Sequence, residues 1–208
     1  MKKIFPYFGV LAAITYIVTV VVGAAVYPGY SHLVNAISEL TSPGAPHKAL
    51  LDGMFSIYNV LLLSFGVFLF IYPMPVKKNT IKIAAILLAL IGLAGLLMYE
   101  FPMDARGTLA TFRGSIHWVL AGVLSLSTFL AEFMVGFATS NIPSLKKIHV
   151  FSLIMGCITF LSGIVTAIGA QMQFTRFGLI ERITIGSFIL WVLVFSLFLL
   201  REHKEVTV

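Results

Sequence analysis

Long apolar runs, separated by short polar segments, make up nearly all of this chain of 208 residues. Each run is long enough, at about 1.5 Å per residue, for a helix to cross the roughly 30 Å hydrocarbon core of a bilayer. The pattern therefore predicts an all-α polytopic membrane protein, with six transmembrane helices in a single domain that covers residues 1–208. The predicted spans are residues 4–27, 47–72, 81–100, 113–139, 148–170 and 179–200.

The segment between the first two runs, residues 28–46, has a pattern of its own. Its apolar residues Leu33, Ile37 and Leu40 recur at a helical spacing, while polar residues such as Glu39 fall on other faces. This spacing predicts a short amphipathic helix that lies at the membrane interface or caps the bundle.

Small and polar residues recur at helical spacing within several runs. In the third run, Gly92 and Gly95 are predicted points of close helix packing. A stripe along the fifth run is predicted to be a packing seam: Ser152, Gly156, Thr159, Gly163, Thr166 and Ala170. A similar face follows the fourth run: His117, Ala121, Ser125, Thr128 and Glu132. That face indicates either a helix buried against its neighbours or a polar path through the bundle, with Glu132 near Lys146 or Lys147 at the inner end.

The composition supports a membrane location and argues against nucleic acid as a partner. Hydrophobic residues make up 59% of the chain and charged residues 11%, against about 25% charged in soluble domains. The net charge is +6, but most lysines stand at the ends of apolar runs, where they set topology and meet lipid headgroups. Nine basic residues fall on the side of the two termini and five on the other side. This bias predicts cytoplasmic termini, with membrane lipids as partners.

Ionisable residues gather at the predicted outer end of the bundle. Asp52, His117 and Arg182 each lie about one turn below the outer edge of the second, fourth and sixth spans. Because lipid tolerates ionisable side chains only when they face the protein interior, these three are expected to converge at one depth. The loop that follows the third span is expected to close over them with Glu100, Asp104, Arg106 and Arg113, and the first loop is expected to add Ser38 and Glu39.

The residue types at this end suggest specific roles. Arg106, Arg113 and Arg182 are candidates to hold an anionic group. Asp104 and His117 form the candidate acid–base pair, and Ser38 is a candidate nucleophile. Further candidate binding residues are Glu39, Asp52, Asn59 and Glu100. A cofactor is not defined: carboxylates and a histidine could hold a metal ion, but no H-x-x-x-H or H-E-x-x-H spacing occurs, so no metal ligands are assigned.

Four short motifs carry a resemblance to a known family: Asn35-Ala36-Ile37-Ser38-Glu39-Leu40, Phe101-Pro102-Met103-Asp104, His117, and Gly178-Leu179-Ile180-Glu181-Arg182-Ile183. With them the chain resembles the six-span prokaryotic proteins catalogued as domain of unknown function nine-nine-eight. The resemblance implies a six-helix fold in the prokaryotic inner membrane and no established activity. The chain is also loosely similar to alkaline-ceramidase-like membrane hydrolases, which use serine, aspartate and histidines around zinc.

Three functions stay open at this point. The first is an outward-facing polar site that binds a lipid headgroup or another amphiphile, with hydrolysis or modification of that lipid as a possible activity. The second is a small secondary transporter or proton-coupled carrier, which predicts a cavity that reaches Glu132. The third is a non-catalytic assembly or immunity-type partner, which predicts closed ion pairs and no cavity.

Overall fold

The protein is a bundle of long helices that run along one common direction. The computed structural model describes residues 4–74, 76–105 and 108–205. Over these residues the long helices are α1 (Phe5–Val26), α2 (Lys48–Ile71), α3 (Lys78–Leu97), α4 (Phe112–Thr139), α5 (Lys146–Gln171) and α6 (Phe177–Glu205). Short 3-10 helices are η1 (Ile37–Thr41) and η2 (Pro143–Leu145). Within these described ranges there is no strand, and six helices are long and apolar enough to cross a membrane, which confirms the predicted fold class.

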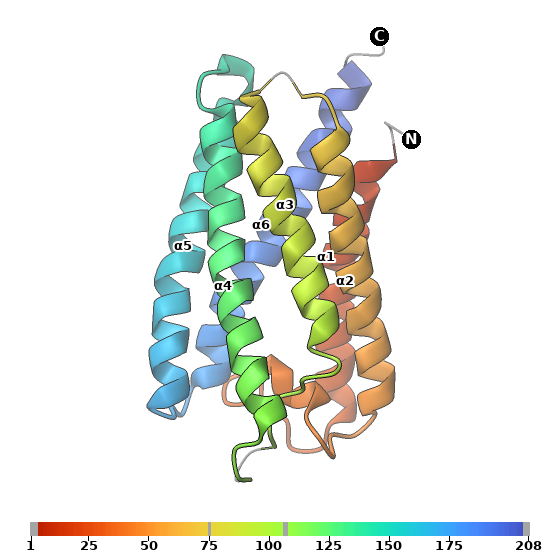
Figure 1. Cartoon of the computed structure of the whole chain (residues 1–208), viewed down its shortest axis with the longest axis vertical. Helices are drawn as coiled ribbons and strands as arrows, with labels where there is room; N and C mark the ends of the chain where they lie inside the picture. Colours follow the sequence, from red (N-terminus) through yellow and green to blue (C-terminus); the bar gives the residue numbers. More distant parts are fainter. Residues whose placement is uncertain (1–3, 75, 106–107, 206–208) are drawn as a thin grey trace.

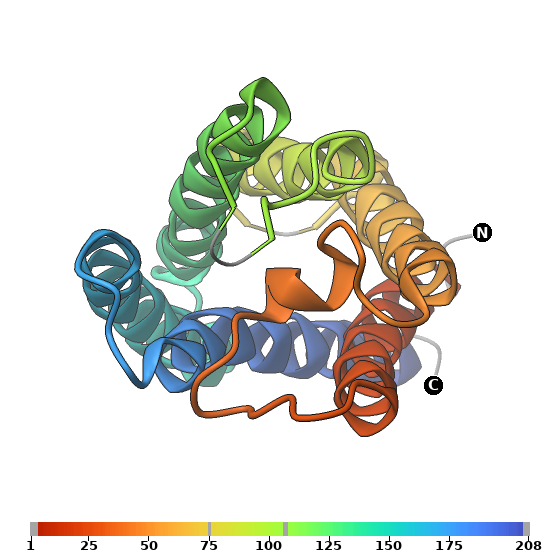
Figure 2. The ribbon, with the colours of Figure 1, turned by 90° about the horizontal axis from the view of Figure 1, so that it is seen from below.

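The helices form a closed ring. Each one packs against its neighbours in the sequence, and α6 returns to pack against α1. Seen along the bundle, η1 lies inside the ring (Figure 2). The start of α1 and the end of α6 lie at the opposite end from η1 (Figure 1). The two ends are called the η1 end and the termini end below.

A large apolar core fills the termini half of the bundle. Its biggest members are aromatic: Phe5 and Phe65 stack on one side, and Trp191 stacks on Phe195 of α6. The indole nitrogen of Trp191 donates to Ser152 Oγ, so this buried ring keeps its hydrogen bond. The more polar interior side chains lie in the other half of the bundle, toward η1.

Glycines let α2 and α3 approach one another closely. A Cβ on Gly92 would lie 2.6 Å from the backbone oxygen of Asn59 and the backbone nitrogen of Leu63. A Cβ on Gly95 would overlap the amide group of Asn59. The prediction that Gly92 and Gly95 are close-packing points is therefore confirmed.

The first loop does not form the amphipathic helix that its spacing predicts. Only the five-residue 3-10 helix η1 is present, and it packs Ile37 and Leu40 inside the bundle while Leu33 stays half exposed. Glu39 is buried, because its carboxylate accepts hydrogen bonds from Ala36 N and Asn35 Nδ2. Pro43 restricts the residue before it to extended conformations, so the element ends at Thr41.

Candidate functional site

A cavity of about 960 Å³ occupies the η1 half of the bundle. Its walls come from η1 and from all six long helices of the described chain. The polar residues on its walls are Ser38, Thr41, Asp52, Ser56, Asn59, His117, Ser125, Thr128, Thr166, Gln171, Glu181 and Thr184. The rest of the lining is mostly apolar and aromatic. A volume of this size, with a few polar groups on apolar walls, is typical of small-molecule binding sites.

The cavity opens sideways between α4 and α5. Toward the termini end the two helices touch, with Gly136 against Leu153 and Gly156 against Phe133. Toward the η1 end they diverge (Figures 1 and 2), and a Cβ on Gly122 of α4 would meet no atom within 4 Å. Trp118 and Ile164 line the cavity beside this gap and are themselves exposed, which places the opening of the cavity between α4 and α5.

This divergence changes the meaning of the small-residue stripe on α5. Ser152 and Gly156 pack against α6 and α4 as a seam, in agreement with the sequence-based prediction. Gly163, Thr166 and Ala170 instead line the cavity. The stripe is a packing seam in one half of the helix and a cavity wall in the other.

His117 is held in one orientation by the turn that follows α3. Its Nδ1 lies 3.0 Å from the backbone oxygen of Phe101. A carbonyl oxygen can only accept, so Nδ1 carries the proton, and in the uncharged imidazole Nε2 is the basic nitrogen. Nε2 has no hydrogen-bond partner among the described residues, and His117 lines the cavity. A ligand in the cavity can therefore donate a hydrogen bond or a proton to His117.

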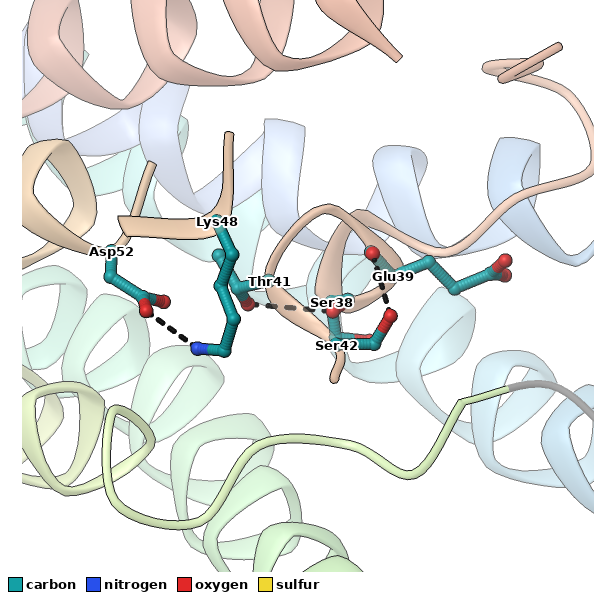
Figure 3. Close-up of polar contacts among 6 residues, drawn as sticks. All are labelled: Ser38, Glu39, Thr41, Ser42, Lys48 and Asp52. Atoms are coloured by element: carbon teal, nitrogen blue, oxygen red, sulfur yellow. Dashed lines mark hydrogen bonds and ion pairs between the residues drawn. The ribbon is translucent and has the colours of Figure 1, made fainter. Parts of the chain in front are cut away.

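Asp52 and Asn59 contribute to the same cavity from α2. One oxygen of Asp52 accepts from Lys48 Nζ at 2.5 Å, one turn earlier on the helix (Figure 3). Its other oxygen has no partner among the described residues. Asn59 lies two turns further in, with its amide packed on Gly95. Asp52 is buried and faces inward, and it shares the cavity wall with His117.

Glu181 is a cavity residue that the sequence-based site omitted. Its Oε2 accepts from the backbone nitrogen of Ile37 at 2.6 Å, which ties α6 to η1. The other oxygen has no partner among the described residues, and the side chain lines the cavity. The sequence signals an inward ionisable residue here, because a charge just inside an apolar run is expected to face the interior, but Glu181 and the adjacent Arg182 satisfy this rule equally.

Arg182 does not join Asp52 and His117, so the predicted convergence of all three is wrong. Its guanidinium donates to Tyr30 Oη at 2.6 Å, to the backbone oxygens of Asn35 and Gly178 at 2.9 Å each, and to His32 Nδ1 at 3.2 Å. It is absent from the lining of the 960 Å³ cavity. Successive helical residues point about 100° apart, so with Glu181 turned inward Arg182 faces the first loop. Its role in this structure is to fasten that loop to α6.

The loop after α3 also differs from the predicted lid. Arg113 and Glu100 lie 3.7 Å apart with side chains 66% and 59% exposed, so this pair is a surface contact. The two oxygens of Asp104 accept from Thr111 Oγ1 at 2.7 Å and from Thr111 N at 2.9 Å. These bonds lower the pKa of Asp104 and fix the start of α4. None of the three residues lines the cavity, and Arg106 lies outside the described residues.

The predicted acid–base pair of Asp104 and His117 is not formed. Asp104 is bound to Thr111 and makes no hydrogen bond to His117 in the described chain. Ser38 lines the cavity, but its hydroxyl donates to Met103 Sδ at 3.2 Å. Among the described residues, no group of three or more His, Cys, Asp or Glu side chains is placed to hold a metal ion.

Acid pH is expected to loosen the first loop through His32. Arg182 Nε donates to His32 Nδ1, so this nitrogen must be unprotonated, and partial burial and the nearby guanidinium lower the pKa of His32. A base with a lowered folded-state pKa stabilises the fold above its ordinary pKa of about 6.5 and loses that contribution as the pH falls below it. The melting temperature in detergent should therefore fall more steeply below pH 6.5 for the wild type than for His32→Asn, whose amide oxygen can accept from Arg182. Equal pH profiles of the two proteins would contradict this expectation.

In the described chain, six apolar helices around a cavity that is polar in part define the class of this protein: a polytopic membrane protein with an internal cavity. The chain belongs to the family of proteins of unknown function DUF998, whose model matches residues 10–197. This match confirms the family resemblance. Neither the curated proteins nor the solved structures gave a match. The similarity to alkaline-ceramidase-like hydrolases stays a prediction.

Proposed function

We propose that the protein binds a membrane amphiphile, with the head group in the cavity and the apolar chain leaving between α4 and α5. The observation that carries this proposal is the sideways opening of a partly polar cavity between two helices that diverge toward the η1 end. Around the opening, Trp118, Leu126 and Ile164 both line the cavity and remain exposed. Such a surface suits an acyl chain, and the polar groups deeper inside suit a head group.

The charges on the cavity wall favour a head group that donates hydrogen bonds. Asp52 and Glu181 each keep one carboxylate oxygen without a partner among the described residues, and His117 offers Nε2 as an acceptor. Arg182 and Arg113, the candidates for holding an anion, point elsewhere. The matching chemistry is an amine, hydroxyl or amide head group rather than an anionic one. This choice refines the earlier expectation of an arginine clamp.

Catalysis on the bound amphiphile is a further part of this proposal. His117 is the residue best placed to accept a proton, because Phe101 holds its Nδ1–H and leaves Nε2 toward the ligand space. Ser38 supplies a hydroxyl group to the cavity lining. A lipid hydrolase or lipid-modifying enzyme would use both His117 and Ser38, whereas a lipid-binding protein would need only His117.

The cavity argues against the third hypothesis, a purely structural cluster, which predicted closed ion pairs and no cavity. The transporter hypothesis predicted a cavity that reaches Glu132. The floor of the cavity includes Ser125 and Thr128, and Glu132 lies one turn beyond Thr128 without lining it. A cavity that ends before Glu132 fits a binding site better than an open channel.

The η1 end is proposed to face the outside of the inner membrane. By the sequence, nine basic residues fall on the side of the chain termini and five on the other side. The nine include Lys2 and Lys3, which lie outside the described residues. The amphiphile would then come from the outer leaflet of that membrane.

Filling the opening is expected to remove the bound lipid. Gly122→Phe places a ring in the space where a Cβ meets no atom, so the fold should stay intact while the cavity is blocked. Wild type reconstituted in equal amounts of phosphatidylethanolamine and phosphatidylglycerol should retain phosphatidylethanolamine in native mass spectrometry, and Gly122→Phe should lose it.

The matched control is Gly53→Phe. Gly53 is another exposed helical glycine whose Cβ would meet no atom, and it lies outside the cavity lining. This variant should retain the lipid as the wild type does. Equal lipid retention by Gly122→Phe and wild type would overturn the proposal, and preferential retention of phosphatidylglycerol would overturn the assignment of the head group.

A further inference from the structure

Glu132 is a carboxylic acid inside the candidate membrane span of α4, two helical turns before the helix ends at Thr139. Its side chain is fully buried, at 0% exposure. Oε1 accepts from Thr159 Oγ1 of α5 at 3.2 Å, and Oε2 has no hydrogen-bond partner in the described structure. The expected pairing of Glu132 with Lys146 or Lys147 is therefore not made among the described residues.

Among the described residues, no cation compensates this carboxyl group. The helices packed nearest to α4 are α3 and α5, and α6 touches it only slightly. Their basic residues stand elsewhere: Lys82 lies over the ring of Phe70, and His149 Nδ1 lies 2.7 Å from the backbone oxygen of Gly136. None of them forms an ion pair or hydrogen bond with Glu132 in the described chain. An ionised carboxylate in such surroundings is strongly destabilised, so the acid form is the one that the site accommodates.

The cavity ends within one helical turn of this acid. Thr128 and Ser125 line the floor of the cavity, and Glu132 follows Thr128 by one helical turn. On the other side, toward the termini end, Val135 and Thr139 are fully buried, and the Thr139 hydroxyl bonds to its own helix. Water can therefore come closest to Glu132 from the cavity side.

We propose that Glu132 is a proton-binding site inside the membrane that exchanges its proton with the cavity past Thr128. On release, the O–H bond of the acid breaks, the proton passes to water in the cavity, and the carboxylate is left with the Thr159 hydroxyl as its donor. Uptake reverses these steps. The site needs no particular amphiphile, so it goes beyond the proposed function and gives the cavity a means to couple its contents to a proton.

The first test is labelling with dicyclohexylcarbodiimide, a membrane-soluble reagent that adds to protonated carboxyl groups. The O–H group of the acid adds across a C=N bond of the reagent and rearranges to a stable N-acylurea, with no leaving group. In nanodiscs at neutral pH, peptide mass spectrometry should find the adduct at Glu132 in preference to Asp52 and Glu100. Labelling should decline as the pH rises and should be lost in Glu132→Gln.

The second test measures the route of exchange. The infrared band of the protonated carboxyl shifts when hydrogen is replaced by deuterium, so its rate of change in heavy water reports proton exchange. Thr128→Leu should slow this exchange by about tenfold or more, because it places an apolar group between the acid and the cavity. Thr139→Val, which likewise replaces a hydroxyl-bearing side chain by an apolar one on the other side of Glu132, should leave the rate unchanged.

Three results would overturn the proposal. They are absence of the adduct at Glu132 at every pH, protection of Glu132 by sodium ions at constant pH, and slowing by Thr139→Val instead of Thr128→Leu. None of these measurements depends on lipid retention. Failure here is thus distinguishable from failure of the proposed amphiphile site.

Discussion

Gly92→Ala is expected to cost the protein about 3 kcal/mol or more of stability, the upper end of what overpacking costs. The new Cβ would lie 2.6 Å from two backbone atoms of α2, the oxygen of Asn59 and the nitrogen of Leu63. Backbone atoms inside a helix cannot move aside as a flexible side chain can, so α2 and α3 must separate. Their separation also removes the support of Asn59 on Gly95 at the cavity wall. Thermal unfolding in a mild detergent, followed by circular dichroism, measures the loss.

The control for this variant is Gly53→Ala on α2. A Cβ there meets no atom within 4 Å, and alanine favours a helix over glycine by up to about 1 kcal/mol. This variant should therefore melt at or slightly above the temperature of the wild type. If Gly92→Ala melted with it, the close contact between α2 and α3 would not be a determinant of stability.

Arg182→Ala is expected to cost about 3 kcal/mol, since hydrogen bonds made by charged groups contribute roughly 1.5–3 kcal/mol and this half-buried side chain makes several. Tyr30 receives one of these bonds and passes it on by donating to Ala36 O at 2.8 Å, and burial raises the pKa of Tyr30 to about 12. The hydroxyl therefore stays protonated at physiological pH. Without Arg182 the first loop should open before the rest of the bundle, which hydrogen exchange of residues 30–42 would detect.

Two further variants separate the charge of Arg182 from its geometry. Arg182→Lys keeps the charge but loses the planar fork that reaches several acceptors at once, so most of the cost should remain. Arg113→Ala removes an exposed pair with Glu100 and should change stability by less than about 1 kcal/mol. Equal stability of Arg182→Ala and Arg113→Ala would contradict the role assigned to Arg182.

The six-helix architecture was predictable because lipid imposes it on the sequence. Without water to satisfy the backbone, an apolar run of this length has to be a helix, and its ends are marked by charge and proline. The inward placement of Asp52 and His117 followed from the same reasoning, since their depth and polarity left no other stable position. In both cases the structure follows from the inability of lipid to solvate polar groups, and the apolar composition of the chain shows that lipid is its surroundings.

The rest of the site depends on how each helix is rotated and tilted, which packing decides. Glu181 and Arg182 are adjacent, and the sequence offers no rule for which one turns inward. The α5 stripe reads as one seam, although α5 leaves α4 beyond Gly163. Asp104 accepts two hydrogen bonds from Thr111, and these contacts form only when the turn before α4 closes. Such choices are settled by tertiary contacts over many residues.

The sideways opening between α4 and α5 also determines how the cavity would be filled. An occupant that arrives through this opening is drawn from a two-dimensional reservoir, so occupancy follows its mole fraction in the leaflet rather than its aqueous concentration. An abundant membrane component can then saturate the cavity through contacts that would be too weak to bind it from water. Any competitor has to partition into the bilayer first, and its apparent potency will scale with the amount of membrane present.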